Sequence, residues 1–149
     1  MNPQDILLVE DNPDDVELTR IAFVEAGIDR RLVVVRDGAE ALDYLFARGT
    51  HADREGAELP AIVLLDLNLP ELDGREVLQG IRSDERTRNL PVVVLTTSSA
   101  EEDILKSYNL HANCYVVKPV EFESFVKAVQ SIQHFWFSVV TLPPGKESA

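Results

Sequence analysis

The sequence is poor in several features that mark particular classes of protein. It has one cysteine, Cys114, so no internal disulfide can form, which fits a reducing compartment. The N-terminus lacks the basic start and long apolar stretch of a signal peptide, and no apolar run approaches the ~20 residues that span a bilayer. These absences predict a cytoplasmic protein that does not insert into a membrane.

Positive charge is also scarce. The chain has 26 acidic and 14 basic residues, a formal net charge of -12, and no basic run is long enough to reverse that balance. Nucleic acids and anionic membranes are bound through cationic patches, so we expect neither as a partner. A metal cation or a positively charged protein surface fits this charge better.

Short apolar runs rich in β-branched residues alternate with longer helical patterns along the chain. The runs are Ile6–Val9, Leu32–Val35, Ile62–Leu65, Val92–Leu95 and Tyr115–Val117. The helical patterns cover residues 13–26, 38–48, 74 to about 82, about 100–110 and 121 to about 137, and the polar stretch 49–60 is predicted to be a surface loop. This alternation predicts an α/β fold, a doubly wound parallel sheet with five helices on its two faces.

The length of 149 residues suits one domain. We expect this domain to cover residues 1–142, including an extension of the last helix, and residues 143–149 to form a flexible tail. Roughly a dozen residues follow the last predicted helix, too few for a DNA-binding domain, so we expect no output domain.

Four of the predicted strands end in residues with complementary chemistry. Glu10 and Asp11 follow the first strand, Asp66 the third, Thr96 the fourth and Lys118 the fifth. Each of these residues alone has an ordinary structural explanation, such as a cap or a solvated turn. However, the carboxyl ends of parallel strands form the functional crevice of such a sheet, so we expect these groups to meet there.

A divalent cation and phosphoryl transfer explain this combination of groups. Crowded carboxylates repel each other, and Mg²⁺, which prefers oxygen ligands, offsets that repulsion. The backbone carbonyl of Asn68 can join Asp66 as a ligand. Aspartate can act as a nucleophile in phosphoryl transfer, and the Lys118 ammonium and Thr96 hydroxyl can stabilise the charge that develops on the phosphoryl oxygens.

Four motifs of the chain resemble the CheY-like receiver domains of response regulators. They are Val9–Asn12, Leu64–Pro70 followed by Gly74, Leu95–Thr97 and Val117–Pro119. The resemblance extends from about residue 5 to residue 137 and implies a five-stranded sheet of order 2-1-3-4-5.

The resemblance also implies a role for each site residue. Asp66 would be the phosphoacceptor and Asp11 a direct Mg²⁺ ligand, with Glu10 assisting through water. Lys118 and Thr96 would bind the phosphoryl group.

A conformational switch is implied as well. Tyr115, three residues before Lys118, matches the switch aromatic of the family. On phosphorylation Thr96 would move toward the phosphate and Tyr115 would rotate inward, which would change the surface of the fourth helix, fifth strand and fifth helix.

A narrower resemblance is to the stand-alone response regulators of bacterial and cyanobacterial phytochromes. It is carried by Glu10–Asp15, the stretch 49–60 and the extension Phe135–Val140, and it implies a photosensor histidine kinase as phosphodonor. The apolar residues of the extension exceed what one core face needs, and such exposed clusters mark partner surfaces. We therefore expect a homodimer through the helix 4–strand 5–helix 5 face and the C-terminal extension.

The sequence leaves other interpretations open. The favoured one is a signalling switch rather than an enzyme with an external substrate. An aspartate-nucleophile phosphohydrolase would use a similar sheet and Mg²⁺, although its nucleophile follows the first strand. A pseudo-receiver that is not phosphorylated and acts as a binding module would share the fold, so the chemistry of the site must decide.

Overall fold

The structure, a computed structural model, describes residues 5–28, 30–67, 74–96, 112, 114–117, 126–127 and 130–131. The chain divides into two compact units, Met1–Val16 with Arg30–Pro119 and Glu17–Asp29 with Val120–Ala149. The described elements are β1 (Ile6–Val9), α1 (Pro13–Glu25), β2 (Leu32–Val35), α2 (Gly38–Phe46), the 3-10 helix η1 (Gly49–Arg54), β3 (Ile62–Asp66), α3 (Gly74–Ser83), β4 (Val92–Thr96) and β5 (Cys114–Val117).

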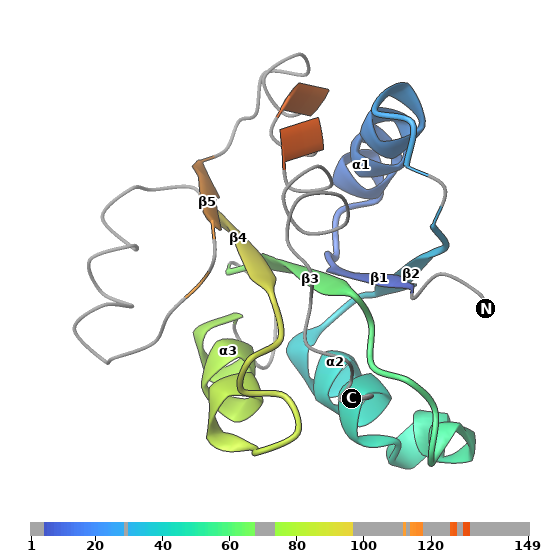
Figure 1. The fold of residues 1–149 in the computed structure, drawn as a ribbon, viewed down its shortest axis with the longest axis vertical. Coiled ribbons are helices and arrows are strands. Elements are labelled where there is room, and N and C mark those ends of the chain that lie inside the picture. Colours follow the sequence, from blue (N-terminus) through green and yellow to red (C-terminus); the bar gives the residue numbers. More distant parts are fainter. Residues whose placement is uncertain are drawn as a thin grey trace, which may run out of the picture. The chain divides into compact units, whose positions relative to one another are not determined.

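The first unit is built on a parallel sheet of order β2-β1-β3-β4-β5 (Figure 1). Every neighbouring pair of strands is parallel, and Val9 of β1 pairs with both Val35 of β2 and Leu65 of β3. The predicted α/β fold with a parallel sheet is therefore confirmed. This register brings the carboxyl ends of the strands to one edge.

One face of the sheet packs against α2 and α3, which lie on the same side of it (Figure 1). Alternate strand residues point into this core, as expected for a period of two. The cluster comprises Leu7, Val9, Val35, Ala41, Tyr44, Leu45, Val63, Leu65, Leu67, Val77, Leu78, Ile81, Leu90, Val92 and Val94. The strand residues between them, such as Leu8 and Leu64, are at most 2% exposed, which explains why the strands have continuous apolar sequences.

Local signals define both ends of α1. The side-chain oxygen of Asn12 accepts hydrogen bonds from the backbone N–H groups of Asp14, at 2.8 Å, and Asp15, at 3.4 Å, which makes Asn12 the N-cap. At the other end Gly27 adopts φ 75°, and the N–H of Ile28 donates to the carbonyl of Phe23 at 3.1 Å. A glycine in the left-handed conformation just after the last helical turn is a common way for a helix to end.

The second helix and the stretch that follows it differ from the prediction. Helix α2 ends at Phe46 rather than at residue 48, because Ala47 adopts a left-handed conformation with φ 54°. The first half of the predicted surface loop is the 3-10 helix η1, which is held against α2. Arg54 lies 3.6 Å from the Tyr44 ring centroid and donates to the Tyr44 carbonyl at 3.1 Å, and His51 Nε2 lies 3.2 Å from the Glu40 carboxylate.

Two of the predicted helices fall largely outside the described residues. The helix at 100–110 lies wholly outside them, and of the helix from 121 only residues 126–127 and 130–131 are described, all helical. Among the described residues, no helix is long and apolar enough to cross a membrane.

Candidate metal and phosphoacceptor site

The first two acidic residues of the site follow β1 directly. The Glu10 N–H donates to the Val35 carbonyl at 3.0 Å, so the hydrogen bonding between β1 and β2 continues one residue past the strand. Glu10 is therefore held at the sheet edge, where its side chain is only 1% exposed. Asp11 is exposed, and the next residue, Asn12, donates its N–H to the Glu10 carboxylate at 3.4 Å. One carboxylate thus points inward and the other is open to solvent.

The third acidic residue, Asp66, is the last residue of β3. Val9 pairs with Leu65, so the residues that follow them, Glu10 and Asp66, lie side by side at the ends of the neighbouring strands β1 and β3. Asp66 pairs with Leu95 of β4 on its other side, and it is 3% exposed. The sheet register, rather than a local turn, therefore fixes the position of this carboxylate.

Gly74 packs closely against the backbone of Asp66 and Leu67. Its N–H donates to the Leu67 carbonyl at 3.2 Å. A Cβ atom on Gly74 would lie 2.5 Å from both the Asp66 carbonyl oxygen and the Leu67 Cα. Only glycine fits there without moving the backbone beside the site. This contact gives a physical reason for the Gly74 that follows Leu64–Pro70 in the family motif.

The three carboxylates meet in one cluster. Glu10, Asp11 and Asp66 each offer a carboxylate oxygen, and these oxygens lie within 4.8 Å of one another. At that separation the two buried groups, when ionised, repel each other by about 3 to 4 kcal/mol at an effective dielectric of about 20. The predicted juxtaposition of these three residues is confirmed.

The donor set fits a hard cation. Carboxylate oxygens are the ligands that Mg²⁺, Ca²⁺ and Mn²⁺ take in proteins, and a cation would offset the repulsion between the buried groups. The exposed Asp11 leaves a side of the cluster accessible to solvent, as a site that retains water ligands and admits a phosphoryl donor requires.

The remaining predicted site residues are described in part or not at all. Thr96 ends β4, one residue past the Leu95 that pairs with Asp66, and it pairs with Val117 of β5. Tyr115 lies in β5 opposite Val94. For Thr96 and Tyr115 the structure describes the backbone alone. Asn68 and Lys118 lie outside the described residues.

Comparison with known proteins agrees with this geometry. The family model described as the response regulator receiver domain matches residues 6–130. The response regulator Rcp1 of Synechocystis is 44% identical over 141 residues, which cover 95% of this chain and 94% of Rcp1.

Solved structures give the same result at the level of the fold. The phosphorylated cyanobacterial phytochrome response regulator RcpA matches with a TM-score of 0.80 and 45% identity, covering 95% of this chain and 99% of RcpA. The bacteriophytochrome response regulator RtBRR matches with a TM-score of 0.80 and 48% identity, covering 99% and 88%. The Mn²⁺-bound form of Rcp1 matches with a TM-score of 0.78 and 44% identity, covering 95% and 99%.

Proposed function

We propose that this chain, which belongs to the response regulator receiver domain family, accepts a phosphoryl group on Asp66 in a two-component phosphorelay. One observation carries the proposal. The carboxylates of Glu10, Asp11 and Asp66 converge within 4.8 Å at the carboxyl edge of the sheet. The strand register holds the buried Asp66 carboxylate there next to two further acids, which supports the nucleophilic role proposed for it.

Mg²⁺ is the proposed cofactor. Asp11 and Asp66, with the backbone carbonyl of Asn68, would hold it directly, and Glu10 would assist through a water ligand. When bound, the ion would neutralise charge on the phosphoryl group and the carboxylates. The Mn²⁺ in the structure of Rcp1 supports a divalent ion in a related protein.

The chain's own residues would perform the transfer. A carboxylate oxygen of Asp66 attacks the phosphorus of a phosphohistidine, the phosphorus–nitrogen bond breaks, and an acyl phosphate forms on Asp66. Lys118 would pair with the phosphoryl oxygens and Thr96 would donate a hydrogen bond to another of them. Thr96 and Tyr115 would then change the surface made by β5 and the helices proposed at about 100–110 and 121–137. With these two helices the domain would have the five that the sequence predicts.

A phytochrome photosensor histidine kinase is the proposed phosphodonor. The support is that RcpA and RtBRR are named as response regulators of phytochromes and share 45% and 48% identity with this chain over nearly its whole length. The proposed receiver domain covers residues 1–142. A cytoplasmic location follows from exchange with such a kinase and remains a prediction.

A homodimer through the helix 4–strand 5–helix 5 face and the C-terminal extension also remains a proposal. Its support is the apolar content of the sequence Phe135–Val140. Light scattering at tens of micromolar, with and without phosphorylation, tests it. A monomer in both states would contradict the dimer.

Intact-mass measurement after incubation with acetyl phosphate tests the proposed function directly. We expect Mg²⁺-dependent gain of one phosphoryl group by the unaltered chain, and no gain with EDTA or in Asp66→Asn. Asp14→Asn, an exposed substitution outside the cluster, is the matched control and should gain the group normally.

The same experiment separates the alternatives. Absence of the gain in every condition would favour a pseudo-receiver that binds partners without phosphorylation. Rapid release of phosphate with repeated turnover of acetyl phosphate would favour a phosphohydrolase. A stable or slowly lost phosphoryl group supports the signalling switch.

A further inference from the structure

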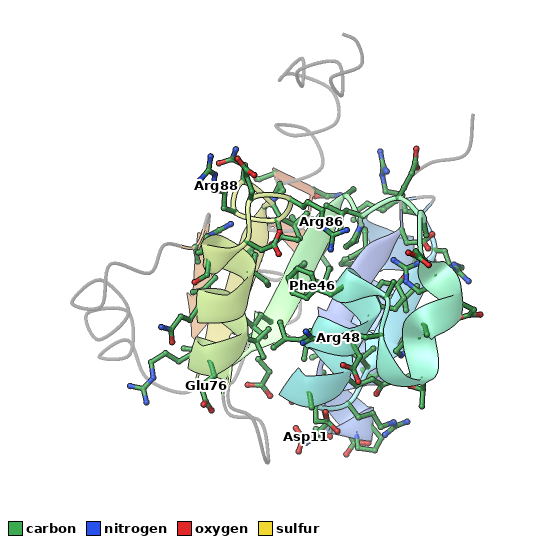
Figure 2. The ribbon with its side chains drawn as sticks, turned by 90° about the horizontal axis from the view of Figure 1, so that it is seen from below. Asp11, Phe46, Arg48, Glu76, Arg86 and Arg88 are labelled. Carbon is green, nitrogen blue, oxygen red and sulfur yellow. The ribbon has the colours of Figure 1, made fainter. Side chains whose placement is uncertain are left out.

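A second cluster of charged side chains lies away from the acidic site, on the surface formed by the C-terminal ends of α2 and α3. It consists of Phe46 and three exposed arginines, Arg48, Arg86 and Arg88, and we call it the Phe46 patch. Figure 2 shows Arg86 and Arg88 at one end of the view and Asp11 at the other, with Phe46 between α2 and α3. The connection that carries Arg86 and Arg88 leads into the start of β4, whereas the acidic cluster lies at the carboxyl ends of the strands.

The Phe46 ring is the centre of the patch. It packs partly against the core cluster and remains partly exposed. The guanidinium carbons of Arg48 and Arg86 each lie 5.4 Å from its centroid, within the range of a cation–π contact. The two guanidinium carbons are therefore separated by no more than twice that distance, although they come from different segments of the chain.

Internal hydrogen bonds hold the backbone of the patch. Arg82 donates to the carbonyls of Arg88, at 2.9 Å, and Leu90, at 2.7 Å. The buried Thr87 hydroxyl donates to the Ile81 carbonyl at 2.6 Å. A backbone ordered in this way loses little further conformational freedom when a partner binds.

Among the described residues, Arg48 and Arg86 of the patch each form an exposed ion pair. Arg48 lies 3.2 Å from Asp43 and Arg86 lies 3.7 Å from Asp84, and the two arginine side chains are 59% and 63% exposed. Exposed ion pairs of this kind contribute little free energy, so the carboxylates of a partner can replace them at small cost.

The local charge also distinguishes the patch. The three arginines of the patch, with Arg82 next to them, lie in a chain whose formal net charge is -12. Charges are screened over about 8 Å at physiological salt, so an anionic group close to the patch responds mainly to these arginines and to the carboxylates of Asp43 and Asp84 beside them, which the arginines outnumber.

We propose that the Phe46 patch is a docking surface for an acidic segment of a protein partner. In this complex an apolar side chain of the partner contacts the exposed part of the Phe46 ring, and flanking carboxylates pair with Arg48 and Arg86. The ring selects a peptide over a simple anion because phosphate or a lipid headgroup has no apolar group to place on it.

Fluorescence anisotropy with a short synthetic peptide tests this surface. In the probe, glutamates flank a single leucine; one control peptide has lysines in place of the glutamates, and another has serine in place of the leucine. We expect the charge reversal R48E/R86E to weaken binding of the probe about tenfold or more. Phe46→Leu should weaken it about threefold. R48Q/R86Q, which introduces no new acids, should also weaken it, and Arg20→Glu, a matched reversal on α1, should not.

Other outcomes would overturn the proposal. Equal affinity of the unaltered protein and R48E/R86E for the probe would show that the patch is not the binding surface, as would failure of the probe to bind. Equal binding of the serine peptide, or displacement by inorganic phosphate, would reduce the patch to an anion site. Binding to vesicles of anionic lipid but not to the peptide would assign it to membranes. Self-association abolished by R48E/R86E would assign it to a second copy of the chain.

Discussion

Alanine at Gly74 should destabilise the protein and disturb the phosphoacceptor, whereas alanine at Gly80 in the same helix should not. A Cβ on Gly74 would lie 2.5 Å from two backbone atoms, the Asp66 carbonyl oxygen and the Leu67 Cα. Backbone atoms in a packed sheet edge cannot yield as a side chain does. A Cβ on Gly80 would lie 3.1 Å from a methyl carbon of Leu42, a partly exposed side chain that can turn away.

The two substitutions should therefore differ in sign. Overpacking against the backbone costs about 1–3 kcal/mol, and Gly74, as the first residue of α3, gains little from the better helix propensity of alanine. Gly80 lies inside α3, where alanine is favoured over glycine by up to about 1 kcal/mol. We expect Gly74→Ala to lose about 1–3 kcal/mol of unfolding free energy and Gly80→Ala to be neutral or more stable.

Urea unfolding followed by circular dichroism measures both values, and the acetyl phosphate assay measures the effect on the site. Gly74→Ala should also be phosphorylated more slowly, since the shift required is in the backbone of Asp66. Equal stability of Gly74→Ala and the unaltered protein would refute the reasoning, because it would mean that the contact relaxes without cost.

Three further predictions concern the site, the α3–β4 connection and the core. Glu10→Gln should lower Mg²⁺ affinity about tenfold in a calorimetric titration, as for the loss of a group that orients a metal's water ligand, whereas unchanged affinity would exclude Glu10 from the site. Thr87→Val should cost about 1–2 kcal/mol in urea unfolding, because the Ile81 carbonyl loses its 2.6 Å buried donor. Burial raises the pKa of the Tyr44 phenol above 10.0, although nearby Arg54 opposes the shift. Above that pH the unfolded chain loses a proton that the folded chain retains, so stability falls as pH rises, and Tyr44→Phe should make this fall shallower.

The strands were predictable from short continuous apolar runs. The acidic cluster was predictable because the carboxyl ends of parallel strands lie at one edge of a sheet. The runs such as Ile6–Val9 and Ile62–Leu65 are buried on both sides, so they are apolar at every position. In a parallel sheet their carboxyl ends must meet, which is sufficient to bring Glu10 and Asp66 together. The degree of burial of each carboxylate was not predictable, because it depends on the register of the strands and on the close approach of Gly74 to the Asp66 backbone.

Features that depend on contacts between distant residues were not predicted. The order of η1 comes from Arg54 over the Tyr44 ring and His51 beside Glu40, and a polar stretch with two glycines gives no sign of these contacts. The end of α2 at Phe46 depends on a left-handed conformation at Ala47, a residue type that rarely marks such a position. The Phe46 patch was missed for the same reason, since Arg48 and Arg86 are far apart in sequence and form no basic run.

The proposed phosphoacceptor and the Phe46 patch should act independently unless a conformational change links them. Phosphorylation of an ionised Asp66 carboxylate would add about one negative charge at the carboxyl edge of the sheet, because the acyl phosphate carries about two charges and replaces one. The patch is linked to the opposite end of β4, a strand of five residues, and at about 3.3 Å per residue the first and last of them lie about 13 Å apart. This exceeds the screening length of about 8 Å at physiological salt, so the new charge alone should change the affinity for the acidic peptide only slightly. Anisotropy measurements on the phosphorylated and unphosphorylated protein at physiological salt test this expectation. A large difference that persists when salt is raised would show that a change in packing, rather than charge, carries the signal from Asp66 to α2 and α3.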